Sequence, residues 1–320
     1  MKQKFLAIFL LFLTAIIWGF AFVAQVLGGD HLEALTFNGI RFIIGAVSLI
    51  PVYCIFEKET DLSAEEKKAR HKRTLIASLI VGTILFIASG LQQVGTNITR
   101  DPGKSGFITG LYTALTPILY LIIFRKKSPW NTWIGVVCAS VGLYMLCYRP
   151  ENGTMFGMGE LVLFIGAFFW AGHILAVDKF VDRVSLLRFS SWQFFVCGAE
   201  NLIFSLFFEH PDASGFKGAL IPLLYCGILS VGVAFTCQNI AQRMSSPTFA
   251  AIVFSTESVF AAIGGVLWNL ITPERLHVDQ EISTVGYIGC AIIFIGIVLS
   301  QIDLTGLFKR KKTQNTNIGG

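Results

Sequence analysis

The stretch SPTFAAIVFSTESVFAAIGGVLW, from Ser246 to Trp268, decides the fold class of this chain. It is long enough to cross a bilayer, because about 20 apolar residues span the hydrocarbon core. Its single charged residue, Glu257, lies near the middle, where a charge costs about 3 kcal/mol on insertion scales. We therefore predict a membrane-spanning helix whose carboxylate faces a bundle interior or a wet cavity. The carboxylate has two interpretations, a functional group on a solute pathway or a structural group held by a buried partner.

The composition extends this prediction to the whole chain. Of the 320 residues 54% are hydrophobic and 14% are charged, with a mean hydropathy of +0.66, which is typical of a polytopic membrane protein. The net charge of +5 does not indicate a nucleic-acid partner, because Lys and Arg lie in short loops and at the two ends. The seven cysteines form no CxxC pair and indicate packing residues. No metal site, cofactor or catalytic residue is expected.

Ten apolar segments of spanning length follow one another along the chain. The first is too long for the apolar region of a signal peptide, and no cleavage site follows it. The ten segments are Phe5–Gln25, Ala34–Phe56, Thr74–Val94, Lys104–Phe124, Trp130–Tyr148, Met158–Asp178, Leu186–Phe208, Phe216–Asn239, Pro247–Trp268 and Thr284–Gln301. The predicted fold class is all-α integral membrane, with ten transmembrane helices.

The basic residues indicate the orientation of these helices. Of the 25 Lys and Arg residues, 19 lie on the side of the two termini and five on the other, while Arg41 lies inside the second segment. Because loops rich in Lys and Arg stay in the cytoplasm, both termini are expected there, in a plasma or inner membrane. Ser63 and Glu66 have the spacing of a helix capping box. The segment Glu57–Arg73 is accordingly a solvated linker or a short cytoplasmic helix.

The two halves of the chain resemble each other at a shift of 152 residues. AIIWGFAFVA (15–24) matches AFFWAGHILA (167–176), which aligns Trp18 with Trp170. LTFNGIRFII (35–44) matches LRFSSWQFFV (187–196), which aligns Arg41 with Gln193. An internal repeat of this length predicts two copies of one structural unit.

Later helices repeat the pattern more weakly. LQQVG resembles CQNIA, which pairs Gln92 with Gln238, and Gly135 and Gly142 recur as Gly289 and Gly296. Five helices per copy is an odd number, so the second copy enters the membrane from the opposite side. We predict inverted repeats at 1–148 and 149–303, followed by a basic cytoplasmic tail at 304–320. Inverted repeats underlie many secondary transporters, although a duplicated bundle without a transport role is the alternative.

Several motifs together resemble the EamA-type branch of the drug/metabolite transporter superfamily, over about residues 5 to 301. They are WGF at 18–20, LQQVGT at 91–96, GFITGLYTALTPIL at 106–119, FWAGHILAVDKF at 169–180, STESVFAAIGG at 255–265 and PERL at 273–276. The resemblance implies eight helices around a central cavity, with the fifth and tenth at the periphery. It also implies export of amino acids, related metabolites or drugs.

Two charged residues lead the candidates for a substrate or proton pathway. Glu257 is suited to bind a proton on one face and release it on the other, because burial disfavours the charged form of a carboxylate. Arg41 is always charged and needs a partner. That partner is either a glutamate, Glu257 or Glu200, in a structural ion pair, or the carboxylate of a substrate.

Uncharged candidates surround them. Tyr112 and Thr116 belong to a weakly polar stripe of the fourth segment that also includes Thr109 and Thr113. Trp18 and Trp170 are cavity walls or packing residues. Four amide side chains near the ends of helices have two interpretations: they form gates or line the cavity, or they cap their helices at the membrane interface. They are Gln92, Gln93, Gln238 and Asn239. His173 is a further cavity candidate. Glu200 either lines the cavity or bonds between helices.

The predicted function is a secondary transporter that exports a small polar or amphipathic metabolite, such as an amino acid, or a drug, by alternating access. Proton coupling and uncoupled facilitation both stay open. A membrane-embedded enzyme of lipid metabolism is less favoured, because the polar residues run through the middle of the membrane and do not gather at one face. The expected partners are a small solute and the lipid bilayer, without nucleic acid; protons and a second copy of the chain stay open.

Overall fold

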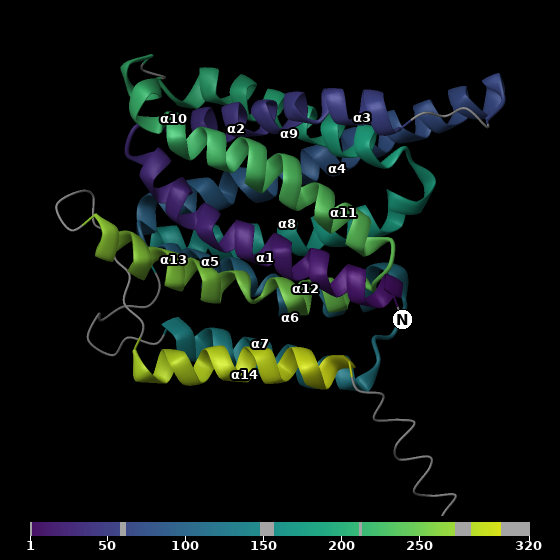
Figure 1. Cartoon of the computed structure of the whole chain (residues 1–320). Coiled ribbons are helices and arrows are strands. Elements are labelled where there is room, and N and C mark those ends of the chain that lie inside the picture. Colours follow the sequence, from purple (N-terminus) through teal and green to yellow (C-terminus); the bar gives the residue numbers. More distant parts are fainter. Residues whose placement is uncertain (1, 58–61, 148–156, 211–212, 273–282, 302–320) are drawn as a thin grey trace, which may run out of the picture.

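The computed structural model describes residues 2–57, 62–147, 157–210, 213–272 and 283–301, and every regular element in these ranges is helical (Figure 1). The elements are α1 (Lys2–Gly29), α2 (Ala34–Ser48), α3 (Ile50–Phe56), α4 (Ala64–Thr99), α5 (Pro102–Gly110), α6 (Tyr112–Phe124), α7 (Trp130–Cys147), α8 (Met158–Phe180), η2 (Val181–Arg183), α9 (Leu186–Phe208), η3 (Ala213–Gly215), α10 (Phe216–Leu224), η4 (Tyr225–Phe235), α11 (Thr236–Gln242), α12 (Pro247–Phe254), α13 (Glu257–Ile271) and α14 (Thr284–Gln301). The PERL motif and the tail 304–320 lie outside the described residues.

All ten predicted apolar segments are helical along most of their length. Within the described ranges, seven helical stretches are long and apolar enough to cross a membrane, and α7 and α14 are shorter apolar helices. α9 has the predicted bounds but is not among the seven, and Arg188, Gln193 and Glu200 make it more polar. An all-helical membrane protein is confirmed, while the count of ten spans stays a prediction.

The capping box at the start of α4 is confirmed. The Ser63 hydroxyl accepts a hydrogen bond from the Glu66 backbone N–H, and the Glu66 carboxylate accepts one from the Ser63 N–H at 2.9 Å. Because α4 has 36 residues, it is about 54 Å long, well beyond a hydrocarbon core of about 30 Å. Its first turns therefore extend outside the membrane.

The predicted stretch 246–268 forms most of one of the seven helical stretches of spanning length, 247–271, but this stretch is interrupted once and is not a regular helix throughout. α12 ends before a tight turn at Ser255 and Thr256, and Glu257 is the first residue of α13. Both hydroxyls donate to carbonyl groups of the preceding turn, at 2.7 Å each, and so compete with the helical hydrogen bonds. A similar interruption at Leu111 separates α5 from α6, whose first residue is Tyr112. Both interruptions lie beside the cavity described below.

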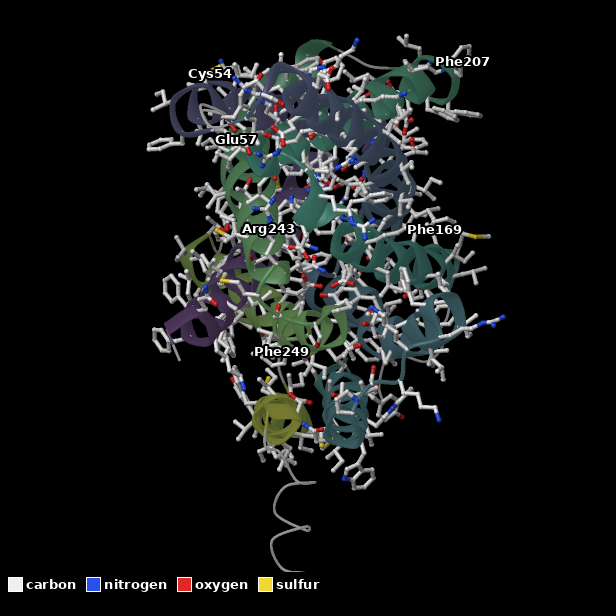
Figure 2. The ribbon with its side chains drawn as sticks, turned by 90° about the vertical axis from the view of Figure 1, so that its right-hand side faces the viewer. Cys54, Glu57, Phe169, Phe207, Arg243 and Phe249 are labelled. Carbon is white, nitrogen blue, oxygen red and sulfur yellow. The ribbon has the colours of Figure 1, made fainter. Side chains whose placement is uncertain are left out.

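The helices pack in pairs that join the two halves of the chain. α2 packs along α9, α4 along α8, and α7 along α14 at one edge of the bundle (Figure 1). The turned view in Figure 2 shows the α7–α14 pair as a separate layer, with Phe249 of α12 above it. Residues that the repeat aligns also meet. The rings of Trp18 and Trp170 lie 6.3 Å apart, and those of Phe42 and Phe194 lie 6.2 Å apart.

Two glutamates 152 residues apart make matching contacts across α2 and α9. Glu209, which follows α9, accepts hydrogen bonds from two backbone N–H groups in the first turn of α2, at 2.6 and 2.8 Å. Glu57, which follows α3, accepts two from the first turn of α9, at 3.1 and 3.0 Å. A carboxylate stabilises a helix N-terminus because the first N–H groups have no partner within the helix. Each half of the chain therefore caps a helix of the other.

Four glycines allow α7 and α14 to approach closely. A Cβ atom on Gly142 would lie 2.5 Å from the carbonyl oxygen of Gly289, and a Cβ on Gly289 would lie 2.5 Å from the carbonyl oxygen of Gly142. Gly135 and Gly296 repeat this relation at 3.0 and 3.1 Å. The close approach that these glycines permit thus occurs within one chain.

We expect Gly142→Leu to lower the melting temperature of the purified protein by several degrees, because overpacking costs about 1–3 kcal/mol. Thermal unfolding in detergent measures the change. The control is Val141→Leu, at a neighbouring position on the exposed face of the same helix. Equal melting temperatures for the two variants would contradict the close packing of α7 on α14.

Candidate functional site

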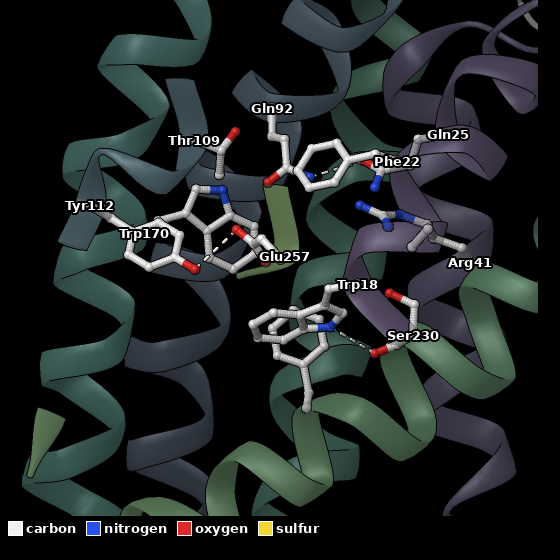
Figure 3. A pocket seen from close by; sticks show the side chains of 12 residues that line it. Trp18, Phe22, Gln25, Arg41, Gln92, Thr109, Tyr112, Trp170, Ser230 and Glu257 are labelled. Carbon is white, nitrogen blue, oxygen red and sulfur yellow. Dashed lines mark hydrogen bonds between the residues drawn. The ribbon is translucent and has the colours of Figure 1, made fainter. Parts of the chain in front are cut away.

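A small cavity lies in the bundle where the two interrupted helices meet α1, α2, α8 and η4 (Figure 3). It is lined by Trp18, Ala21, Phe22, Gln25, Arg41, Gln92, Thr109, Tyr112, Trp170, Ser230, Phe235 and Glu257. Its volume of about 30 Å³ has room for one or two water molecules, whereas ligand pockets usually measure about 300–1,000 Å³. The structure is therefore a closed form, and the helices must separate before an organic solute can enter.

Glu257 and Tyr112 connect the two interrupted helices. The Tyr112 hydroxyl donates a hydrogen bond to Glu257 Oε1 at 2.9 Å, and both side chains are buried. The other carboxylate oxygen accepts no hydrogen bond from a described residue. Glu257 also begins α13, and the N-terminal end of a helix favours a negative charge. The carboxylate is thus held in place while retaining an oxygen that can bind a further group.

Arg41 lines the same cavity from α2 and is only 3% exposed. Its Nε donates to Asn38 Oδ1 at 2.8 Å, and its guanidinium lies over the Phe42 ring, 5.0 Å from the centroid. Neither glutamate suggested as a structural partner pairs with it, and Arg41 forms no ion pair with any described carboxylate. Glu200 is half-buried away from the cavity and accepts a hydrogen bond from a threonine of α4.

A buried network of uncharged groups fixes Arg41. The Asn38 amide donates to Ser89 Oγ at 2.9 Å and to Asn201 Oδ1 at 3.0 Å. The Asn201 amide in turn donates to the backbone carbonyl of Cys197 at 2.8 Å. The network joins α2, α4 and α9 and contributes no negative charge, so it orients the guanidinium without neutralising it.

Aromatic rings form the walls of the cavity. The Phe235 ring lies 4.6 Å from the Trp18 ring and 6.0 Å from the Trp170 ring. Phe235 ends η4, an 11-residue π-helix, and π-helical turns are rare and occur frequently at functional sites. The Trp18 indole N–H donates to the Ser230 carbonyl of this segment at 3.2 Å, which ties α1 to η4.

Amide clusters lie towards the two ends of the bundle. At the end where α1 and α4 finish, Gln92 donates to Gln25 Oε1 at 3.0 Å, and Gln93 donates to the Gln25 backbone carbonyl at 3.1 Å. At the other end, the Asn239 amide donates to a serine of α9, and Gln238 donates to Gln242 at 2.8 Å. The first cluster joins α1 to α4 within the first half of the chain, and the second joins α11 to α9 within the second half.

Six of the twelve predicted pathway residues line the cavity: Glu257, Arg41, Tyr112, Gln92, Trp18 and Trp170. The other six do not line it. Gln93, Gln238 and Asn239 belong to the amide clusters, Thr116 bonds to the Tyr112 carbonyl, His173 Nε2 lies 3.3 Å from Gln193 Oε1, and Glu200 bonds to α4.

The prediction omitted Ala21, Phe22, Gln25, Thr109, Ser230 and Phe235 from the pathway. Gln25 closed the predicted first segment, whereas α1 continues to Gly29, so Gln25 lies deeper than its predicted place at the segment end. Thr109 was within the polar stripe of the fourth segment, which was the one available signal. Ser230 and Phe235 gave no signal, because a π-helical turn changes which residues face the cavity.

The model of the EamA-like transporter family matches residues 5–148 and again residues 157–302. The chain belongs to the EamA-like transporter family. This EamA-like transporter is 26% identical over 308 residues to the uncharacterized transporter YoaV of Bacillus subtilis, covering 93% of this chain and 96% of YoaV. It is 25% identical over 189 residues to the aromatic amino acid exporter YddG of Salmonella typhimurium, covering 54% of this chain and 62% of YddG.

A solved crystal structure has the same fold as this EamA-like transporter. The TM-score is 0.67 at 16% identity, and the match covers 92% of this chain and 96% of the other. The family and the names of the relatives indicate a membrane transporter rather than an enzyme. A small-molecule solute and the lipid bilayer are its corresponding partners.

Proposed function

We propose that this protein is a secondary transporter that exports a small zwitterionic solute, an amino acid or a related metabolite, by alternating access. The observation that carries the proposal is that Arg41 and Glu257 line one closed cavity without forming an ion pair with each other. Removing two ions from water costs several kcal/mol each unless each meets a partner. A solute with one carboxylate and one ammonium group supplies a partner for both.

The neighbours of the two charges support this assignment. Arg41 presents a planar guanidinium that matches a carboxylate in two-point geometry, and Asn38 fixes its orientation. Glu257 keeps one oxygen for an ammonium group. The aromatic walls of Trp18, Trp170 and Phe235 suit the apolar part of the solute, and the relative YddG is named an aromatic amino acid exporter.

Proton coupling follows from the same carboxylate. Among the described residues Glu257 is the single carboxylate that lines the cavity, and Tyr112 and Arg41 are the other ionisable groups there. Desolvation disfavours a charged carboxylate without a partner. Glu257 therefore binds a proton when the solute has left and releases it when an ammonium group arrives. An uncoupled facilitator of the same solutes is the alternative.

Alternating access requires ten spans that form two inverted repeats, at 1–148 and 149–303, with both termini in the cytoplasm. Three observations support it: the contacts between the aligned pairs Trp18–Trp170 and Phe42–Phe194, and the matching caps of Glu57 and Glu209. Residues close to a two-fold axis contact their own counterparts, so contacts between aligned residues support such an axis.

Transport by the purified protein in proteoliposomes tests the proposal. We expect a pH gradient to drive uptake of labelled amino acids, and a protonophore to reduce that uptake to the rate without a gradient. Liposomes without protein are the control. An uptake rate that is the same with and without the pH gradient would favour the uncoupled facilitator. The absence of uptake for every amino acid, amine and amide analogue would contradict the proposed solute class.

A further inference from the structure

The aligned residues Trp18 and Trp170 face one cavity, but their indole N–H groups differ. Trp18 Nε1 donates to the Ser230 carbonyl at 3.2 Å. Trp170 Nε1 is buried and has no hydrogen-bond partner among the described residues, and the same holds for the hydroxyl of Thr109. Thr109 and Trp170 both line this small cavity (Figure 3). The cavity lining thus includes two polar groups that have no hydrogen-bond partner among the described residues.

Packing does not explain these two groups. A phenylalanine would form the same wall as Trp170 without burying a donor, and a valine would replace Thr109 at nearly the same volume. Buried polar groups in folded proteins are nearly always paired, so those that are not require a reason. A polar solute that enters this cavity can supply a partner for both groups.

We propose that Trp170 and Thr109 bind an amide group on the side chain of the solute, so that the carrier prefers amide-bearing amino acids to apolar ones. An indole N–H can only donate, and it meets the amide oxygen; a hydroxyl can also accept, and it meets the amide N–H. A second carboxylate is disfavoured, because Glu257 lines the same cavity. The inference rests on the proposed function, in which Arg41 and Glu257 bind the two main-chain charges.

The test is the ratio of uptake efficiencies for glutamine and norleucine, whose side chains have similar length. We expect the full-length protein in proteoliposomes to favour glutamine. Trp170→Phe should lower the ratio by about 3- to 10-fold, the effect of one neutral hydrogen bond. Thr109→Val should lower it similarly, whereas Thr109→Ser should retain it.

Trp18→Phe is the matched control, because it removes the same N–H from the equivalent side chain. Since the acceptor of Trp18 is the Ser230 carbonyl, this variant should slow both solutes and leave the ratio unchanged. An unchanged ratio in Trp170→Phe, or an equal fall in Trp18→Phe, overturns the inference while leaving a zwitterion carrier intact. If the unmodified protein transports neither solute and neither stabilises it in thermal shift, the inference is overturned; the proposed function fails as well only when every other amino acid is also inactive.

Discussion

Replacing Glu257 by Gln is expected to abolish the response of amino-acid uptake to a pH gradient. Glutamine keeps the size of the side chain and an oxygen for the Tyr112 hydroxyl, but it can neither bind a proton in this range nor offset the charge of an ammonium group. Removing one partner of a buried charge pair costs about 2–5 kcal/mol, which is about 30-fold or more in affinity. Uptake at several values of internal and external pH measures the effect.

Tyr112→Phe is the control for Glu257→Gln. It removes the 2.9 Å hydrogen bond and leaves the carboxylate, so coupling to the gradient should persist with a change in its pH range. Melting temperatures of both variants exclude a loss of folding. A gradient response that is the same in Glu257→Gln as in the unmodified protein would rule out this residue as the coupling group.

Arg41→Gln is expected to remove recognition of the solute carboxylate. The change copies Gln193, the residue at the aligned position of the second half, so the substitution is one that the architecture already accommodates. Affinity for amino acids should fall by about 30-fold or more, again the effect of an unpaired buried charge. Affinity for the corresponding amines, which lack the carboxylate, should change little.

Competition by amino acids and by their amines, measured side by side, checks this expectation. Arg41→Lys is the graded control. Lysine keeps the charge but loses the two-point geometry and the hydrogen bond from Nε to Asn38, so it should retain part of the preference. If amino acids and amines lose affinity equally in Arg41→Gln, the guanidinium has a structural role in place of a recognition role.

Hydropathy and the repeat predicted the fold better than they predicted the site. The apolar runs located the helices because the bilayer imposes their length, and α9 and α14 begin and end where predicted. The alignment of the two halves at a shift of 152 residues predicted that Trp18 and Trp170 occupy equivalent positions, and their rings lie 6.3 Å apart. Glu257 and Arg41 were found because charges at membrane depth are rare.

The missed features depend on local hydrogen bonds that hydropathy does not reveal. The turn at Ser255 and Thr256 interrupts the apolar run without a proline at the turn, and the π-helix of η4 has no sequence signature. The sequence repeat gave Gln238 and Asn239 the same predicted role as Gln92. Gln92 lines the cavity, whereas Gln238 and Asn239 bond to Gln242 and to a serine of α9. Which side of a helix an amide faces is decided by tertiary packing.

The crossed caps of Glu57 and Glu209 have a consequence for assembly. Each carboxylate accepts hydrogen bonds from the first turn of a helix in the other half of the chain, so neither cap can form until both halves are present. The mutual dependence is symmetric, but the cavity is not: Arg41 lines it, and the aligned Gln193 does not.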